Sequence, residues 1–446
     1  MKNTFFGGVH PNDRKAATAS KATEVLAAPA EVIIPMSMHV GAPCAPEVAK
    51  GDYVFKGQRI GSSPAPVSAP IHASVSGTVK AVEPRLHPNG TKVMSVVIEN
   101  DMQEALHESV VPCADPAALT PEEITQIVKE KGITGMGGAA FPTHFKISSG
   151  VGKVDTLIVN GAECEPYITS DHRTMLELTN EVIEGVRLAV RATGVKTAVI
   201  AVENNKKDAI AALEAALTDE DRKTISVMGL RVRYPQGSEK QLIQSVTGKQ
   251  VPPGGLPASV GCSIMNVFTC YCIYRAVYEG MPAIERIVTI SGSAVNEPKN
   301  LLAKVGTPVS ALFDACGGFK TQPDKILQGG PMMGIAQFST EFPIIKNTNA
   351  ILALGKEENR SVEDPTCIRC GKCITVCPMK LKPIYMYQYE QKGDLEMLTK
   401  LNVTDCTECG SCAYTCPGRL YLVHSFRTAK QMLINAKNAQ QQKEGK

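Results

Sequence analysis

The pattern of apolar and polar positions changes several times along this chain of 446 residues. In residues 35–100, short β-rich pieces are separated by Gly and Pro, and apolar and polar positions alternate at 76–82 and 92–98. Several short strands at this spacing predict a small β sandwich or barrel.

In residues 121–280, strand-like apolar runs alternate with segments of helical spacing, which is typical of an α/β fold. Thr120 followed by Pro121 predicts the start of a helix. The apolar runs at 156–159 and 197–202 predict buried strands of the parallel type. Helical spacing predicts one helix over 176–191 and a second, Ala-rich helix over 206–217.

The last third of the chain changes pattern twice more. Residues 285–350 return to strands and turns, and the cysteine motifs follow at 360–420. In residues 421–446, apolar residues recur at 4-3-4-3 spacing and predict one helix with a single apolar stripe: Leu422, Phe426, Ala429, Leu433 and Ala436. We expect this helix to dock on the cysteine-rich domain rather than to lie on a membrane surface.

Composition narrows the class of protein. The length predicts about three domains, and 43% apolar with 20% charged residues is ordinary for a globular protein. A net charge of +3 gives no electrostatic case for nucleic acid as a partner. The sequence contains neither an apolar run of membrane-spanning length nor a signal peptide, so we expect a cytoplasmic chain that reaches a membrane only through partners.

Eight of the 15 cysteines crowd into residues 367–416. They form two C-x2-C-x2-C-x3-C-P runs, the pattern of bacterial ferredoxins that hold two [4Fe–4S] clusters. In this pattern the last Cys of each run ligates the other cluster. The first predicted ligand set is therefore Cys367, Cys370, Cys373 and Cys416, and the second is Cys406, Cys409, Cys412 and Cys377. Zinc is the alternative, but it favours pairs of ligands.

A glycine-rich loop follows the first predicted helix, at Gly132–Lys146. Its backbone N–H groups can approach a phosphate closely, although a plain turn would look much the same. The strand ends at Asn160–Tyr167 and Met265–Val267, and the segment Tyr234–Lys240, add polar groups where α/β folds bind ligands. Cys262, Cys270 and Cys272 favour buried packing over a further metal site.

These segments resemble the FMN- and NADH-binding subunit of respiratory complex I and related hydrogenase flavoproteins. The resemblance implies an FMN site made of Gly135, Gly137, Gly138, Lys146, Asn160, Glu163, Tyr234, Gly237 and Asn266. It also implies that Phe141 stacks near the nicotinamide of NAD(H), and that Glu165 and Glu239 lie beside the dinucleotide. The sequence departs from the family pattern at Met136, Ala162 and Ser238. These departures affect the expected position of the nicotinamide more than the expected binding of the flavin.

The order of segments, led by Phe5–Pro11, looks like the RnfC family of the Rnf (Rsx) electron transport complexes. This resemblance implies a multidomain α/β and α+β fold with these parts: an N-terminal segment (1–34), a β barrel-sandwich (35–112), an FMN/NADH-binding α/β core like the complex I flavoprotein (113–282), a β-grasp, SLBB-like module (283–350), a helical double [4Fe–4S] ferredoxin-type domain (358–420) and a C-terminal helix (421–446). Residues 68–83 resemble a biotinyl/lipoyl hairpin, but its tip reads Ala-Ser-Val and has no attachment Lys, so we expect a structural or docking role.

The family implies a peripheral subunit on the cytoplasmic side of the cell membrane, in an ion-translocating ferredoxin:NAD oxidoreductase. Its partners are then NAD(H), the other membrane and iron–sulfur subunits, and ferredoxin indirectly. A flavin exchanges hydride with NAD(H) and single electrons with clusters, so we expect no catalytic side chain. Two alternatives are a cobalamin-reductase-like protein, which we expect to lack the leading Gly-Gly-Val-His-Pro segment, and a flavin-free electron relay.

Overall fold

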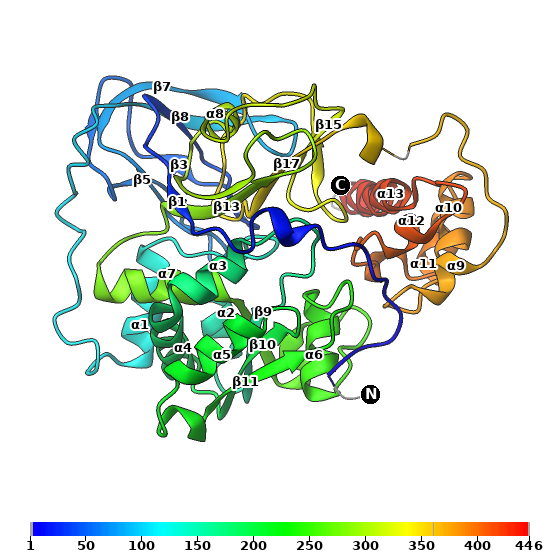
Figure 1. Cartoon of the computed structure of the whole chain (residues 1–446), viewed down its shortest axis with the longest axis horizontal. Helices are drawn as coiled ribbons and strands as arrows, with labels where there is room; N and C mark the ends of the chain where they lie inside the picture. Colours follow the sequence, from blue (N-terminus) through cyan, green and yellow to red (C-terminus); the bar gives the residue numbers. More distant parts are fainter. Residues whose placement is uncertain (1–2, 360, 445–446) are drawn as a thin grey trace.

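The computed structural model describes residues 3–359 and 361–444 (Figure 1). Within these residues the named strands form four sheets. In Figure 1 the β-rich domains lie above the α/β domain, and the cysteine-rich helices lie to one side of both. Short 3₁₀ turns occur at Lys15–Ala17, Asp221–Lys223, Pro257–Val260, Lys356–Glu358 and Val403–Asp405.

The barrel-sandwich has two antiparallel sheets, as the alternating pattern predicts. One contains β2 (Glu31–Pro35), β8 (Lys92–Asn100), β7 (Gly77–Leu86) and β4 (Tyr53–Val54), in that order. The other contains β3 (Ala45–Pro46), β5 (Arg59–Ser62) and β6 (Ile71–His72). The hairpin tip between β6 and β7 is buried: Ala73 and Val75 are fully covered, and the Ser74 hydroxyl donates to the carbonyl of Val305 at 2.6 Å. The tip therefore joins this domain to the β-grasp module.

The α/β core is built on one parallel sheet, with the order β11 (Ile225–Leu230), β10 (Thr197–Glu203), β9 (Thr156–Gly161) and β12 (Cys262–Asn266). Alternate residues of β9 face opposite sides. Leu157 and Val159 pack with α1 (Pro121–Glu130), α2 (Thr143–Gly150), α4 (Thr179–Thr193), α5 (Lys207–Ala216) and α7 (Val267–Tyr278), whereas Ile158 packs with α6 (Glu239–Thr247). Helices on both faces explain why the strands read as continuous apolar runs.

One helix in this domain is confirmed with a different start. The helix expected over 176–191 is α4, which begins at Thr179, and the residues before Leu178 belong to a separate helix, α3 (Ser170–Glu177). The carboxylate of Glu163 accepts hydrogen bonds from the N–H groups of Asp171 at 2.6 Å and His172 at 3.3 Å, so it caps the first turn of α3. This cap comes from outside the helix, where periodicity cannot show it.

The β-grasp module contains a mixed sheet with α8 (Val309–Ala315) packed against it. Its strand order is β1 (Glu24–Val25), β14 (Lys299–Lys304), β13 (Glu285–Ser291), β17 (Ala350–Leu354), β15 (Lys325–Gln328) and β16 (Ile335–Gln337). The edge strand β1 belongs to the N-terminal segment and pairs in parallel with β14. The N-terminal segment thus crosses from the α/β core to this module (Figure 1).

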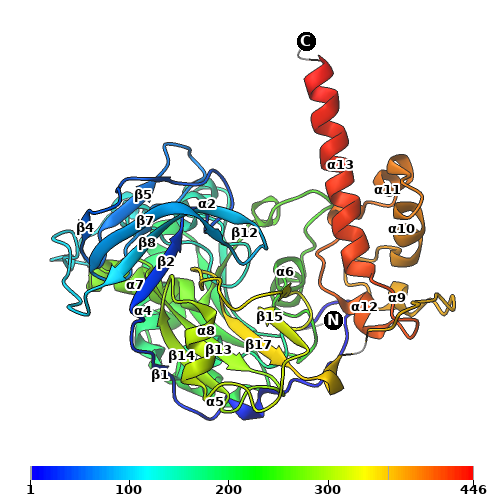
Figure 2. The same ribbon diagram turned by 90° about the horizontal axis from the view of Figure 1, so that it is seen from above.

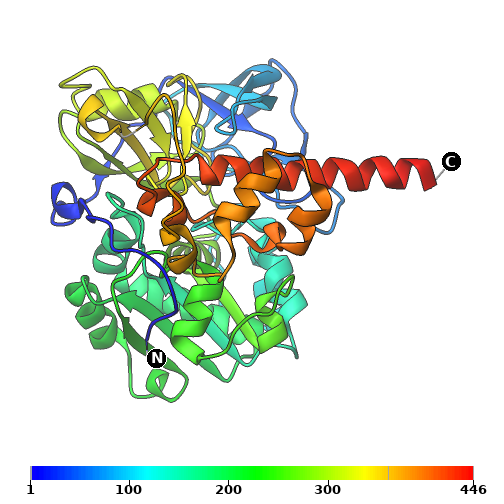
Figure 3. The same cartoon turned by 90° about the vertical axis from the view of Figure 1, so that its right-hand side faces the viewer.

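The cysteine-rich domain consists of short helices: α9 (Lys372–Thr375), α10 (Pro383–Glu390), α11 (Leu395–Lys400) and α12 (Ser411–Thr415). They pack around the first half of α13 (Leu422–Glu444), where Leu422, Phe426 and Ala429 are buried. Ile434 is already 52% exposed, and α13 continues outward from the molecule (Figures 2 and 3). The predicted docking of this helix on its own domain is confirmed. Among the described residues, none of the helices combines the length and apolar character needed to cross a bilayer.

Candidate functional site

The glycine loop forms a closed turn between α1 and α2. Thr134 and Pro142 form an isolated bridge, and the N–H of Gly135 donates to the carbonyl of Phe141 at 2.9 Å. Gly137 lies so close to β12 that a Cβ there would stand 2.8 Å from Nδ2 of Asn266. A Cβ at Gly138 would meet nothing within 4 Å. The loop is therefore fixed at its base and open at its tip.

Lys146 and Phe141 flank this loop. The ammonium of Lys146 donates to the carbonyl of Ile264 at 3.0 Å and lies 3.8 Å from the carboxylate of Glu239. Phe141 is partly exposed and contacts the ring of Phe145 edge-on, with 5.8 Å between centroids. Lys146 thus connects α2 with the middle of β12 and the start of α6.

Two asparagines lie opposite each other at the ends of neighbouring strands. Asn160 and Asn266 are partners in the β9–β12 ladder. Asn160 donates to the carbonyl of Gly237 at 2.9 Å, and Asn266 donates to Asp171 at 2.6 Å while its oxygen caps α7. The two amides hold together the segments that follow the strands.

Glu163 and Glu165 follow β9 and point into the protein. Glu163 is buried beside Lys15, and burial raises the pKa of this carboxyl. Glu165 accepts hydrogen bonds from the N–H groups of Met332 at 3.1 Å and Met333 at 2.9 Å, in the glycine-rich turn of the β-grasp module. Burial raises the pKa of Glu165 to about 7.

Tyr234 connects this region with the cysteine-rich domain. Its buried hydroxyl lies 3.2 Å from Glu165 and donates to the carbonyl of Cys409 at 2.7 Å. Nearby, the N–H of Gly237 donates to the sulfur of Cys164 at 3.3 Å. Glu239, at the start of α6, is 44% exposed at its side chain. The structure thus brings the predicted residues of the glycine loop and both strand ends into one region.

The eight motif cysteines line two cavities. One is lined by Cys377 together with Cys406, Cys409 and Cys412. The other is lined by Cys367, Cys370, Cys373 and Cys416. Each cavity therefore takes three thiols from one run and the last thiol from the other run. In the described part of the chain, no three His, Cys, Asp or Glu side chains converge as they would around one metal ion.

The donors around both cavities suit an iron–sulfur cluster. Backbone N–H groups point at cysteine sulfurs, from Arg369 to Cys367, from Glu408 to Cys406 and from Leu381 to Cys377, each at 3.4 Å. Such bonds stabilise the negative charge that cluster sulfurs carry. The cavities differ in exposure: Cys377, Cys409 and Cys412 are buried, whereas Cys370 is exposed.

The region around the glycine loop also suits a phosphate-bearing ligand. Its open tip leaves room for close approach, and two buried polar atoms of the loop and of the side chain that binds its tip have no protein partner: Oγ1 of Thr134 and Oδ1 of Asn347. Such atoms are normally satisfied by water or ligand. Cys262, Cys270 and Cys272 are buried, as expected for packing residues.

Sequence reasoning did not find two lysines that hold these loops. Lys346 is buried and donates to the carbonyls of Gly132 at 2.7 Å and Pro70 at 2.8 Å, and burial lowers its pKa to about 8. The neighbouring Asn347 donates to the carbonyl of Gly138 at 2.8 Å. Lys15 of the N-terminal segment binds the loop after β9. A charged residue inside the apolar run FPIIKNTNAIL is the one signal that could have indicated Lys346.

Four family models match the chain, in the order of the domains. They are the RnfC barrel sandwich hybrid domain at 3–103, the Nuo51 FMN-binding domain at 128–275, the SLBB domain at 287–336 and the 4Fe-4S dicluster domain at 360–417. The fold resembles that of an NAD+-reducing [NiFe]-hydrogenase in its H2-reduced state, with a TM-score of 0.51 at 18% identity over 75% of this chain and 69% of that one. The fold and matched domains define a multidomain electron-transfer subunit with an FMN-binding domain and a dicluster domain.

Curated relatives narrow this class. The C subunit of the Na(+)-translocating ferredoxin:NAD(+) oxidoreductase complex of Acetobacterium woodii is 46% identical over 97% of both chains. The C subunit of the proton-translocating ferredoxin:NAD(+) oxidoreductase complex of Clostridium ljungdahlii is 45% identical over 88% of this chain and 85% of that one. The chain belongs to the RnfC family, which supplies one subunit of the Rnf ion-translocating ferredoxin:NAD(+) oxidoreductase complexes.

Proposed function

We propose that this chain is the NAD(H)-facing subunit of such a complex, with FMN at the glycine loop and two [4Fe–4S] clusters in the cysteine cavities. Bound FMN would exchange hydride with NAD(H) and single electrons with the clusters. The protein would hold these groups in position, and no side chain would act as a general acid or base. The observation that carries the proposal is the contact from Tyr234 to Cys409, which joins the predicted flavin site directly to a cysteine cavity.

The chain's own residues have distinct roles in this proposal. The open backbone at Gly138 and the ammonium of Lys146 receive the flavin phosphate, and Asn160 and Asn266 hold the segments beneath it. Phe141 lies at the partly exposed side, where nicotinamide enters. Glu165 and Glu239 lie on the dinucleotide side. Phe141, Glu165 and Glu239 are assigned by resemblance to the complex I flavoprotein.

The burial of the two cavities suggests the order of electron transfer. The cavity with Cys377 and Cys409 is buried and contacts Tyr234, so it is the one next to the flavin site. The cavity with Cys370 lies at the surface. Electrons would therefore pass between the flavin, the buried cluster and then the exposed cluster, which meets the iron–sulfur partner subunits. Those partners would hold the chain at the cytoplasmic side of the membrane and exchange electrons with ferredoxin.

Anaerobic reconstitution with iron, sulfide and FMN, followed by an NADH titration, tests this function. We expect flavin absorbance that NADH bleaches, and paramagnetic cluster signals that appear during the titration. Lys146→Ala should retain less flavin, because the cation that faces the phosphate is lost. The exposed variant Lys400→Ala, whose lysine pairs with Glu396 on the surface of α11, serves as the control.

Each alternative gives a different result. Fully metallated protein that retains no flavin would overturn the proposal and leave an electron relay. Flavin-loaded protein that is reduced by NADH but passes electrons to cobalamin instead of to iron–sulfur partners would favour a cobalamin reductase. Unchanged flavin content in Lys146→Ala would contradict the placement of the phosphate.

A further inference from the structure

An N-terminal strap, residues 3–25, runs from the end of β11 in the α/β core, past the cysteine-rich domain, to the edge of the β-grasp sheet (Figure 1). It starts at the end of β11, where the N–H of Arg231 donates to the carbonyl of Asn3 at 3.2 Å, and it then passes the cysteine-rich domain, where the N–H of Gly8 donates to the carbonyl of Val376 at 2.8 Å. Val9 and Tyr234 then exchange two backbone hydrogen bonds of 2.9 Å. The strap therefore touches both the predicted flavin site and a segment that carries a predicted cluster ligand.

The strap next meets the loop that follows β9, residues 162–168, which carries Glu163 and Glu165. Glu163 and Tyr167 have left-handed backbone conformations, with φ of 45° and 70°. Non-glycine residues adopt such conformations at a cost, and neighbouring structure must hold them there. The strap makes those contacts: Lys15 binds the carbonyl of Glu163, and the N–H of Tyr167 donates to the carbonyl of Asp13 at 2.7 Å.

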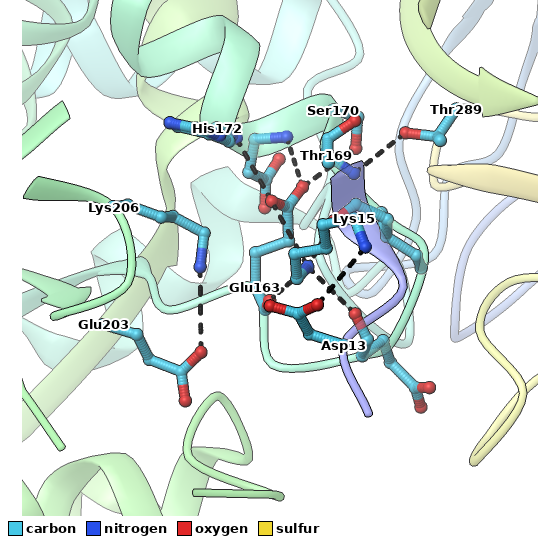
Figure 4. A network of polar contacts seen from close by, with 12 residues as sticks. Asp13, Lys15, Glu163, Thr169, Ser170, His172, Glu203, Lys206 and Thr289 are labelled. Atoms are coloured by element: carbon cyan, nitrogen blue, oxygen red, sulfur yellow. Dashed lines mark hydrogen bonds and ion pairs between the residues drawn. The ribbon is translucent and has the colours of Figure 1, made fainter. Parts of the chain in front are cut away.

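Lys15 makes the densest of these contacts (Figure 4). Its ammonium donates to the carbonyls of Glu163 at 2.9 Å and Glu165 at 3.0 Å, and also to the carbonyl of Ile168. An ammonium has three protons, so its whole donor capacity is directed at this one loop. The side chain is only 8% exposed, and the carboxylate of Glu163 lies 3.8 Å from the ammonium. The compensating charge is therefore part of the same loop.

We propose that Lys15 is a positioning residue of the nucleotide site, which holds the 162–168 loop in its functional conformation through three carbonyl oxygens. This inference rests on the proposed function, in which Glu165 lies beside the dinucleotide. Lys15 acts only through the loop, because its donors are all bound to carbonyls of that loop. A lysine from a segment more than 140 residues earlier in the sequence thereby sets the geometry of the site.

The test compares Lys15→Met with Lys15→Arg and Lys21→Met in the reconstituted chain. Lys21 is the matched control, because it lies on the same strap but binds the carbonyl of Pro298 at the surface. We expect the KM for NADH to rise about tenfold in Lys15→Met, with kcat at saturating NADH of the flavin-loaded protein changed less than about twofold. Lys15→Arg, which keeps charged donors, should recover much of this loss, and Lys21→Met should behave as the parent chain.

Hydrogen–deuterium exchange without nucleotide gives a readout independent of activity. We expect amides of residues 162–168 to exchange about tenfold faster in Lys15→Met, with the sheet of the α/β core unchanged. An unchanged exchange rate and KM would overturn the inference, and so would faster exchange over the whole chain, because that would show a general role in stability. If Lys15→Met does not fold, Lys15→Gln, which keeps an amide donor, is measured in the same way.

The failure of the proposed function would look different. A parent chain that binds no flavin, or that NADH does not reduce, would contradict the function even if loop exchange depends on Lys15. A parent chain that works normally while Lys15→Met matches it in KM and exchange would contradict only the role of Lys15.

Discussion

Gly137 shows how much one missing side chain matters at the base of the glycine loop. A Cβ at this position would come within 3.0 Å of both Nδ2 and Cβ of Asn266. Asn266 cannot yield easily, since it caps α7 and binds Asp171. The neighbouring Gly138 has no such limit, because a Cβ there meets nothing. Neither glycine has a positive φ, so space rather than backbone conformation distinguishes them.

Gly137→Ala and Gly138→Ala should therefore have different effects, the first on the stability of the fold and the second on FMN binding. We expect Gly137→Ala to lower the stability of the chain without flavin by about 1–3 kcal/mol, because the added methyl overpacks the contact with Asn266. Gly138→Ala should leave that stability unchanged and weaken FMN retention, since its methyl occupies the open tip. Urea unfolding of flavin-free protein and flavin content after reconstitution check both. Equal stability losses would contradict this account.

At the scale of elements, the two cysteine runs act together rather than separately. Each run supplies three thiols to one cavity and its last thiol to the other. Gly410 shows how tightly the second run packs against the β-grasp module, because a Cβ there would stand 2.6 Å from the carbonyl of Met332. That turn also binds Glu165 through its backbone amides. One turn of the β-grasp module therefore contacts both predicted redox sites.

Paired serine variants test the crossed ligation. Cys377→Ser combined with Cys406→Ser removes two thiols of one cavity, so about four of about eight irons should remain. Cys377→Ser combined with Cys370→Ser damages both cavities, so we expect almost no iron. If each run held its own cluster, the two results would be exchanged. Iron and sulfide analysis with electron paramagnetic resonance distinguishes these cases.

Periodicity predicted several individual elements, because short-range patterns determine them. The paired parallel strands β9 and β10, the helix start at Thr120 and the last helix follow directly from local sequence. The start of α3 at Ser170 does not, because Glu163 caps α3 from another segment. For the same reason, the motifs indicated Glu163 and Glu165 but not Lys15, whose partners are all distant in the sequence. The domain boundaries stay a prediction.

At the scale of the whole molecule, an ionic network joins three domains. Glu285 of β13 pairs with Arg275 of α7 and with Lys304 of β14. Lys304 also lies 3.2 Å from Glu104, which pairs with Lys56 of the barrel-sandwich. Burial alone raises the pKa of Glu285, but Arg275 and Lys304 outweigh it and bring this pKa to about 2.

This network predicts a specific pH dependence of stability. A carboxyl whose pKa is lowered on folding stabilises the fold above its unfolded pKa of 4.5 and loses that contribution as pH falls through about 2. We expect Glu285→Gln to cost roughly 3 kcal/mol at pH 7. The difference from the parent chain should shrink below pH 4.5. Urea unfolding of cluster-free protein between pH 7 and pH 3 measures it. A constant difference would contradict the role of ionised Glu285.

The buried hairpin tip of the barrel-sandwich has a consequence for how the domains can be separated. In a carrier domain the equivalent tip stays free so that its prosthetic arm can swing. Here the surface around Ser74 is already occupied by the β-grasp module. Removing the β-grasp module from this domain would expose apolar side chains to water, because Val305 and Ile345 are part of the barrel-sandwich core. We therefore expect that the barrel-sandwich cannot be expressed as a soluble domain without the β-grasp module.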